Sequence, residues 1–153
     1  MTEDLTARVA QLEQKILLLE DKEAIRELIA RYAHHATRGH AGEAMSGLFT
    51  DDGVFDARAP GGQKSDIRIE SKEKLRAFFD NMRPGGTTPM IHDLILEFRG
   101  DEASGTCVLD SPCYTGERRG YVGYYEDEFR RVDGRWKFKD RIFFFFQGSA
   151  NQT

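Results

Sequence analysis

The sequence of 153 residues is 39% hydrophobic and 31% charged, which indicates one soluble globular domain rather than a disordered chain. No apolar run reaches the roughly 18 residues of a membrane-spanning helix, and the polar, acidic start of the chain is unlike a secretory signal. A net charge of −4 argues against a surface dedicated to nucleic acid or anionic lipid. We therefore expect a cytoplasmic protein that binds neither nucleic acid nor a membrane.

Residues 1–20 predict a helical arm. Apolar residues recur there at alternating steps of four and three positions, as in the seam of a coiled coil: Leu5, Val9, Leu12, Ile16 and Leu19. The next seam positions are Glu23 and Arg26, so the seam ends after about two heptads. Two interpretations stay open, because the arm could pack on its own domain or on another subunit.

Residues 21–38 predict a second helix, or a continuation of the first. Its apolar face centres close to Tyr32 and includes Ile25 and Leu28. His34 falls on the opposite side and is expected to be exposed, whereas His35 lies at the margin of the apolar face.

The rest of the chain predicts strands with one more clear helix. A short helix over 42–50 leads into a strand beginning at Val54, and Ile67 and Ile69 alternate in another strand. A helix follows over about 71–82 and presents Phe79 on its apolar face. Four long strands are then expected over 88–99, 102–115, 120–132 and 135–147, joined by turns such as Asp133-Gly134. Helices followed by an antiparallel meander indicate an α+β fold.

The last strand is apolar on both faces over residues 142–146. Such a strand is normally covered on both sides. One face can pack on the helices, and a second subunit is the economical cover for the other. We therefore predict a homodimer through the sheet face, with cover by the N-terminal arm as the alternative.

Five segments together resemble the SnoaL-like branch of the nuclear-transport-factor-2-like superfamily. They are Ala24–Tyr32, Leu48–Phe55, Leu96–Asp101, Tyr124–Arg131 and Asp133–Phe138. The resemblance implies a cone-shaped α+β barrel, in which a strongly curved antiparallel sheet wraps around N-terminal helices. It assigns residues 21–148 to the cone domain and leaves 149–153 as a tail.

The resemblance also implies a mostly apolar pocket for a small molecule, common dimerisation and no cofactor. Relatives include scytalone dehydratase, ketosteroid isomerase and polyketide cyclases, which move a proton in a dry pocket. The aspartate and histidine of the dehydratase fall on Thr37 and Pro89 here, and its second histidine falls on Cys113. An arginine found in a related dehydrochlorinase matches Arg141. The Asp/His dyad of those enzymes is therefore not present as such.

His92 and Asp93 are the most interesting polar pair on the first long strand. Neighbouring strand residues face opposite sides, so we expect only one of the two in the pocket and no contact between them. The apolar even positions, such as Leu94 and Leu96, would turn His92 inward, whereas the resemblance turns Asp93 inward. A pocket histidine suits acid–base work near neutral pH, and a pocket aspartate would need a pKa raised by burial.

Tyr32 and Tyr125 are candidate hydrogen-bond donors to a substrate oxygen. Cys113 and Phe79 are expected at the substrate pocket as well. Arg141 is expected either to pair with Asp127 or Glu128 or to bind a substrate anion at this pocket. The acidic run at 126–128 alternates along a strand and is expected to be solvated. Cys107 and Cys113 would lie about 20 Å apart on one strand, too far for a disulfide, and no metal-ligand spacing is present.

Two functions follow as hypotheses. The first is a cofactor-independent lyase or isomerase that acts on an apolar cyclic or aromatic substrate. His92, Asp93 and Tyr32 would be its catalytic residues, and Tyr125, Cys113, Arg141 and Phe79 would bind the substrate. The second is a non-catalytic member of the same fold that binds a ligand or a protein partner.

Overall fold

The computed structural model describes residues 2–59, 64–113 and 120–147. The tail expected at 149–153 lies outside these residues. Within them, no helix is both long and apolar enough to pass through a lipid bilayer.

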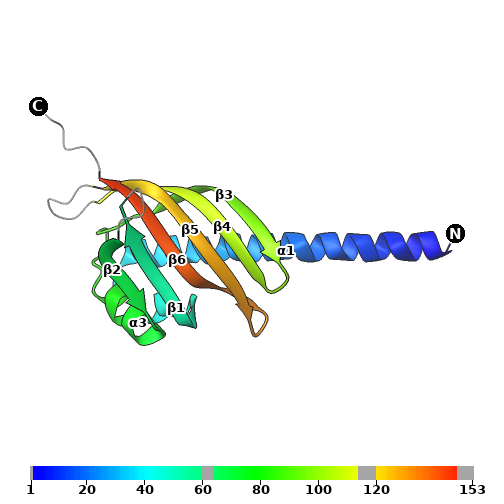
Figure 1. Ribbon diagram of the computed structural model, residues 1–153, viewed down its shortest axis with the longest axis horizontal. Coiled ribbons are helices and arrows are strands. Elements are labelled where there is room, and N and C mark those ends of the chain that lie inside the picture. The colour runs from blue at the N-terminus through cyan, green and yellow to red at the C-terminus, as the bar shows by residue number, and fades with distance from the viewer. Residues whose placement is uncertain (1, 60–63, 114–119, 148–153) are drawn as a thin grey trace, which may run out of the picture.

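A single helix, α1 (Thr2–Arg38), takes up both predicted N-terminal helices. Its sequence has neither glycine nor proline, so nothing interrupts the hydrogen-bond ladder. The helix ends at Gly39, whose φ of 68° is a left-handed conformation that glycine adopts readily. The N-terminal half of α1 extends past the sheet (Figure 1), and every described side chain from Asp4 to Glu20 is exposed. The arm therefore does not pack on its own domain.

The remaining elements form two short helices and one sheet. The helices are α2 (Gly42–Ser46) and α3 (Lys72–Asp80). The strands are β1 (Phe49–Arg58), β2 (Lys64–Glu70), β3 (Met90–Arg99), β4 (Glu102–Ser111), β5 (Tyr121–Val132) and β6 (Arg135–Gln147). Their order in the sheet is β2-β1-β6-β5-β4-β3.

The sheet is curved and unclosed, and it wraps around the C-terminal half of α1 (Figure 1). Strands β3 to β6 form the predicted antiparallel meander. The pairing of β1 with β6 is parallel, so the sheet is mixed rather than wholly antiparallel as expected. Helices first and a curved sheet after them confirm the predicted α+β class.

The core lies between the concave face of the sheet and the helices. From α1, Ile25, Ile29 and Tyr32 are buried, which is the face predicted for this helix. Phe79 of α3 and Phe138 of β6 are among the residues packed with them. His34 is exposed and His35 is half-buried, as their positions on the helix predicted.

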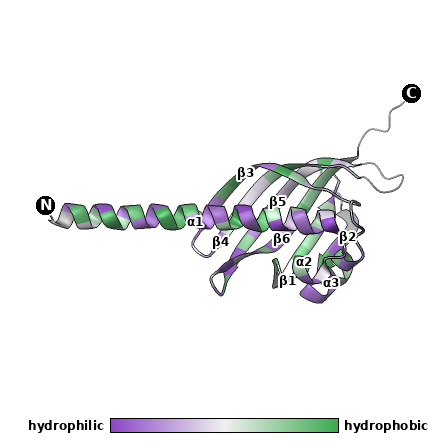
Figure 2. Ribbon diagram, turned by 180° about the vertical axis from the view of Figure 1, so that it is seen from behind, coloured by the Kyte–Doolittle hydropathy of each residue, from purple (hydrophilic) through white to green (hydrophobic). Residues whose placement is uncertain are grey.

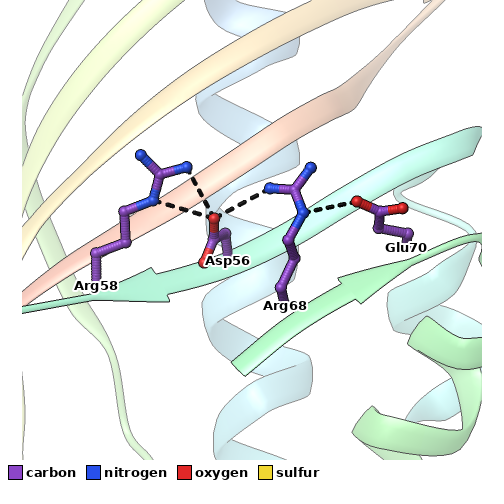
Figure 3. A network of polar contacts seen from close by, with 4 residues as sticks. All are labelled: Asp56, Arg58, Arg68 and Glu70. Atoms are coloured by element: carbon purple, nitrogen blue, oxygen red, sulfur yellow. Dashed lines mark hydrogen bonds and ion pairs between the residues drawn. The ribbon is translucent and has the colours of Figure 1, made fainter. Parts of the chain in front are cut away.

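A polar network fixes the edge pair β1–β2 on the outer face of the sheet (Figure 3). Asp56 is buried and accepts hydrogen bonds from Arg58 Nε and Nη2, at 3.0 and 2.9 Å, and from Arg68 Nη1 at 3.1 Å. Arg68 Nε also donates to Glu70 at 2.6 Å. Because side chains alternate along a strand, the neighbours Phe55 and Ala57 point the other way, into the interior.

Candidate functional site

A cavity of about 960 Å³ lies between the concave face of the sheet and the helices. Every strand except β3 contributes to its wall, together with α1, α3 and the segment that follows α3. The lining residues are Tyr32, Phe55, Ala57, Ile67, Phe78, Phe79, Asn81, Met82, Arg83, Gly86, Thr87, Pro89, Leu109, Ser111, Cys113, Tyr121, Tyr125, Phe143 and Phe145. Most of these side chains are aromatic or aliphatic, so the cavity suits an apolar molecule.

Three tyrosines line the cavity, and two of them, Tyr32 and Tyr125, are buried. Tyr32 comes from the buried face of α1, and Tyr125 comes from the inward face of β5. Their ring centroids lie 6.0 Å apart in an edge-to-face arrangement. Both side chains are almost wholly buried, so burial raises the pKa of each phenol. The two phenols are therefore neutral over the ordinary pH range and can donate hydrogen bonds.

Arg141 of β6 lies behind the two tyrosines and is fully buried. Its guanidinium carbon is 3.6 Å from the ring centroid of Tyr125, 4.2 Å from that of Tyr32 and 4.5 Å from that of Phe138. Cation–π attraction of this kind stabilises a charge that has lost its water. Of the two roles expected for Arg141, the structure shows the ion pair, with Asp127 as its partner. Arg141 is not one of the lining residues and lies against the rings of the two tyrosines.

Asp127 of β5 is the partner of Arg141 and is also buried. Its Oδ1 lies 3.6 Å from Arg141 Nε, which is an ion pair without a hydrogen bond. Among the described residues, neither carboxylate oxygen and none of the three guanidinium nitrogens has a hydrogen-bond partner. The expectation of a solvated acidic run was therefore wrong for Asp127. The alternation of Tyr125, Asp127 and Phe129 on one face of β5 was the signal that could have revealed it.

The pKa values of Asp127, Arg141 and Cys107 differ from the ordinary values of these side chains. Burial raises the pKa of Asp127 to about 7, although the charge of Arg141 acts in the opposite direction. Burial disfavours the charge on Arg141, but Asp127, Tyr125, Tyr32 and Cys107 together more than offset this and raise its pKa. Burial also raises the pKa of the Cys107 thiol to about 11, so this neighbouring group stays neutral.

His92 and Asp93 lie in a different place. They border a separate groove of about 610 Å³ between α1 and β3, together with residues such as Arg26 and His34. Both side chains are exposed, and His92 Nδ1 lies 2.9 Å from Asp93 Oδ2. The expectation that neighbouring strand residues could not meet was therefore wrong here.

A bulge in β3 explains this contact. Asp93 has a φ of 56°, and the register with β4 shifts between His92 and Ile95. Before the bulge the odd residue Ile91 is half-buried, and after it the even residues Leu94 and Leu96 are half-buried. The resemblance, which turns odd-numbered residues inward, was thus correct before the bulge. The apolar pattern, which turns even-numbered residues inward, was correct after it.

The other predicted residues fall in several places. Phe79 and Cys113 line the large cavity, and Pro89 borders both hollows. Thr37, at the position of the family's aspartate, donates its hydroxyl to the Ala33 carbonyl at 2.8 Å. Cys107 and Cys113 are thiols rather than a disulfide, as expected.

The sequence did not reveal the polar pair Ser111 and Thr87, whose hydroxyl oxygens lie 2.9 Å apart at the cavity wall. Among the cavity-lining residues that the structure describes, there is no carboxylate and no imidazole. In the described part of the chain, no group of three or more His, Cys, Asp and Glu side chains could hold a metal ion.

Comparisons with known proteins agree with this architecture. Solved structures of three proteins from Novosphingobium aromaticivorans are similar to this chain. A nuclear-transport-factor-2-like protein with a cystatin-like fold is 27% identical, with 91% of this chain and 90% of that chain covered and a TM-score of 0.73. A candidate aromatic ring hydroxylase is 25% identical, with coverage of 85% and 92% and a TM-score of 0.70. A candidate scytalone dehydratase is 22% identical, with coverage of 87% and 91% and a TM-score of 0.70, and shows the shared fold alone.

None of the curated proteins matches the chain. The model of the SnoaL-like domain matches residues 18–142, which is most of the sequence and excludes nearly the whole exposed arm. The curved sheet, the enclosed helix and this match agree, and the chain belongs to the SnoaL-like domain family.

Proposed function

We propose that the protein binds an apolar cyclic or aromatic small molecule that carries a carbonyl or phenolic oxygen. Such a ligand would occupy the large cavity and receive hydrogen bonds from Tyr32 and Tyr125. The observation that carries the proposal is the pair of neutral, buried phenols in a mostly apolar wall, backed by the buried charge of Arg141. A phenol held near a cation is a stronger hydrogen-bond donor, so the site favours an oxygen that bears partial negative charge.

A pair of matched ligands tests this. α-Tetralone has a fused apolar ring system and one carbonyl oxygen, whereas tetralin has nearly the same shape without the oxygen. We expect the protein to bind α-tetralone more tightly in calorimetric titrations. The variants Tyr32→Phe and Tyr125→Phe should each weaken α-tetralone binding by up to about tenfold, the worth of one hydrogen bond, and leave tetralin binding unchanged.

Tyr124→Phe is the matched control, because Tyr124 is the neighbour of Tyr125 on β5 and does not line the cavity. It stacks on Phe144 instead, with centroids 4.9 Å apart. The control should bind both ligands as the natural protein does. Equal affinity of the natural protein for the two ligands would contradict the role given to the phenols.

A second candidate function is a cofactor-independent lyase or isomerase at the same cavity. The observation that favours it is the buried Asp127–Arg141 pair, whose side-chain polar atoms have no hydrogen-bond partner among the described residues and whose carboxyl has a pKa of about 7. Buried polar groups without partners cost stability, and they are kept most often where function needs them. In this reaction Tyr32 or Tyr125 would stabilise the developing enolate, while Arg141 and Asp127 act as positioning residues beneath them.

Loss of water from a β-hydroxy cyclohexanone tests the catalytic alternative. The carbon next to the carbonyl gives up a proton, the β carbon–oxygen bond breaks, and the departing hydroxide takes up a proton to leave as water. The conjugated enone that remains absorbs in the ultraviolet. We expect Tyr32→Phe and Tyr125→Phe to slow such turnover and His92→Ala to leave it unchanged. Turnover that depends on His92 and not on the tyrosines would contradict a reaction in the large cavity. It would favour the groove between α1 and β3, which His92 and Asp93 border.

We also propose that the protein forms a homodimer through the convex face of the sheet. Val108, Tyr124 and Phe144 are consecutive partners across β4, β5 and β6, and Val122 and Phe146 pair beside them. Val108, Val122 and Phe146 are between 41% and 50% exposed. Apolar side chains gathered on an outer sheet face in this way are typical of a protein–protein interface.

A further inference from the structure

The exposed arm of α1 carries a seam that its own domain leaves uncovered. Leu5, Val9, Leu12, Ile16 and Leu19 are between 46% and 64% exposed. Figure 2 shows hydrophobic residues recurring along this projecting part of the helix. An isolated helix of this length is only marginally stable in water, so a solitary arm whose five seam residues are all exposed lacks the packing that stabilises most helices.

We propose that the arm pairs with the arm of a second copy of this chain as a parallel, in-register, two-stranded coiled coil. The seam assigns Val9 and Ile16 to the heptad positions a, and Leu5, Leu12 and Leu19 to the positions d. Branched Val or Ile at a together with Leu at d is the combination that favours two parallel strands.

Charges beside the seam select the same orientation. Arg8 and Lys15 occupy the g positions, and Glu13 and Glu20 occupy the e positions. In a parallel pair each g residue faces the e residue of the next heptad on the other helix. Arg8 then faces Glu13 of the partner subunit, and Lys15 faces Glu20 of the partner subunit, so that every contact of this kind is attractive.

An antiparallel pair would place g opposite g and e opposite e. In the register that places Val9 opposite Leu19 of the partner subunit, Lys15 would approach Lys15 of the partner subunit, and Glu13 would approach Glu13 of the partner subunit. Like charges in direct contact are destabilising. The charge pattern therefore favours a parallel partner with the same sequence over an unrelated apolar surface.

The position of the seam on α1 leaves room for this pairing. At about 100° per residue, the seam lies on roughly the opposite side of the helix from Ile25 and Tyr32, which pack into the domain. Two arms can meet while their domains lie on the outer sides of the pair. The seam ends at Glu23 and Arg26, where α1 enters the sheet, so the contact is confined to the arm.

The double variant Leu12→Glu/Ile16→Glu tests the pairing. Both side chains are more than half exposed in the single chain, so the change should leave the domain folded. We expect the particle mass from sedimentation equilibrium to fall by half at protein concentrations where the natural protein is fully assembled. If the sheet faces also dimerise, the mass should fall by at least half, to that of a dimer held by the sheet faces alone. The control Gln11→Glu/Gln14→Glu adds the same charge outside the seam and should keep the natural mass.

A cysteine substitution tests the parallel register. Leu5→Cys should form an intermolecular disulfide with oxidised glutathione as the oxidant, because position 5 meets itself only in a parallel, in-register pair. Gln14→Cys faces away from the seam and should not cross-link, which also controls for Cys107 and Cys113. An unchanged mass in Leu12→Glu/Ile16→Glu overturns the pairing. Pairing without the cross-link at position 5 overturns the parallel register.

Discussion

Arg141 is the most demanding residue in the described part of the chain, because its buried guanidinium has no hydrogen-bond partner there. Removing a charge from water costs several kcal/mol, and here the compensation for Arg141 comes from Asp127 and from three aromatic rings. Neither Asp127 nor Arg141 lines the cavity. Arg141 instead contacts the rings of Tyr32 and Tyr125, which both line it. The pair sets the charge behind the two phenols.

We expect Arg141→Met to lower the free energy of unfolding by about 3–5 kcal/mol at pH 8, because it leaves the Asp127 carboxylate buried without a counter-charge. The double variant Arg141→Met/Asp127→Leu should recover most of this loss, since an apolar pair of similar volume has no charge to desolvate. Urea unfolding of the single and double variants measures both effects. A double variant no more stable than Arg141→Met would contradict this account.

The destabilisation caused by Arg141→Met should be larger at high pH than at low pH. Because the pKa of Asp127 is about 7 in the folded chain and near 3.8 in the unfolded chain, folding takes up a proton between these values. The stabilisation that comes from this proton uptake is fully present below pH 4 and is lost as the pH rises through 7. At pH 5 the carboxyl is neutral, so Arg141→Met should cost clearly less than at pH 8. An equal cost at both pH values would show that Asp127 does not titrate in this range.

Among the elements, β3 shows how one residue can redirect a strand. Asp93 adopts a left-handed backbone conformation, and the extra residue turns both His92 and Asp93 to the outer groove. Aspartate tolerates this conformation better than most side chains, whereas a branched residue does not.

We expect Asp93→Gly to stay within about 0.5 kcal/mol of the natural stability, because glycine accepts a positive φ and the His92 contact is exposed. Asp93→Val should destabilise the protein by about 1–2 kcal/mol. Urea unfolding of the two variants provides the comparison. Equal stability of the two variants would mean that the bulge is not fixed by this backbone conformation.

The bulge also marks a limit of sequence reasoning. The strands β3 to β6 could be predicted because apolar alternation and turn residues are local signals, and the burial of Tyr32 followed from helical periodicity alone. A bulge depends on pairing with a neighbouring strand, which a single strand's pattern does not contain. The ion pair of Arg141 with Asp127 was one of the expected alternatives, but the burial of Asp127 was missed, because acidic side chains are mostly exposed.

At the scale of the whole molecule, the two apolar surfaces lie on different sides. The convex patch of Val122 and its neighbours faces away from α1, and the arm seam extends beyond the sheet altogether (Figure 1). In a dimer formed by convex faces, both sheets stand between the two arms. The arms of one such dimer therefore cannot pair with each other, and the arm would join separate dimers into larger particles.

This separation makes the sheet interface testable without interference from the arm. In the Leu12→Glu/Ile16→Glu background we expect a particle of twice the 17.4 kDa chain mass. Adding Val122→Glu should reduce it to the mass of one chain, because the substitution buries a carboxylate in the centre of the apolar patch. Lys137→Gln changes the net charge equally at the far end of the sheet, where the side chain pairs beside Arg130, and should leave the dimer intact. A single-chain mass before Val122→Glu is introduced would exclude the sheet dimer and leave the arm as the contact between copies.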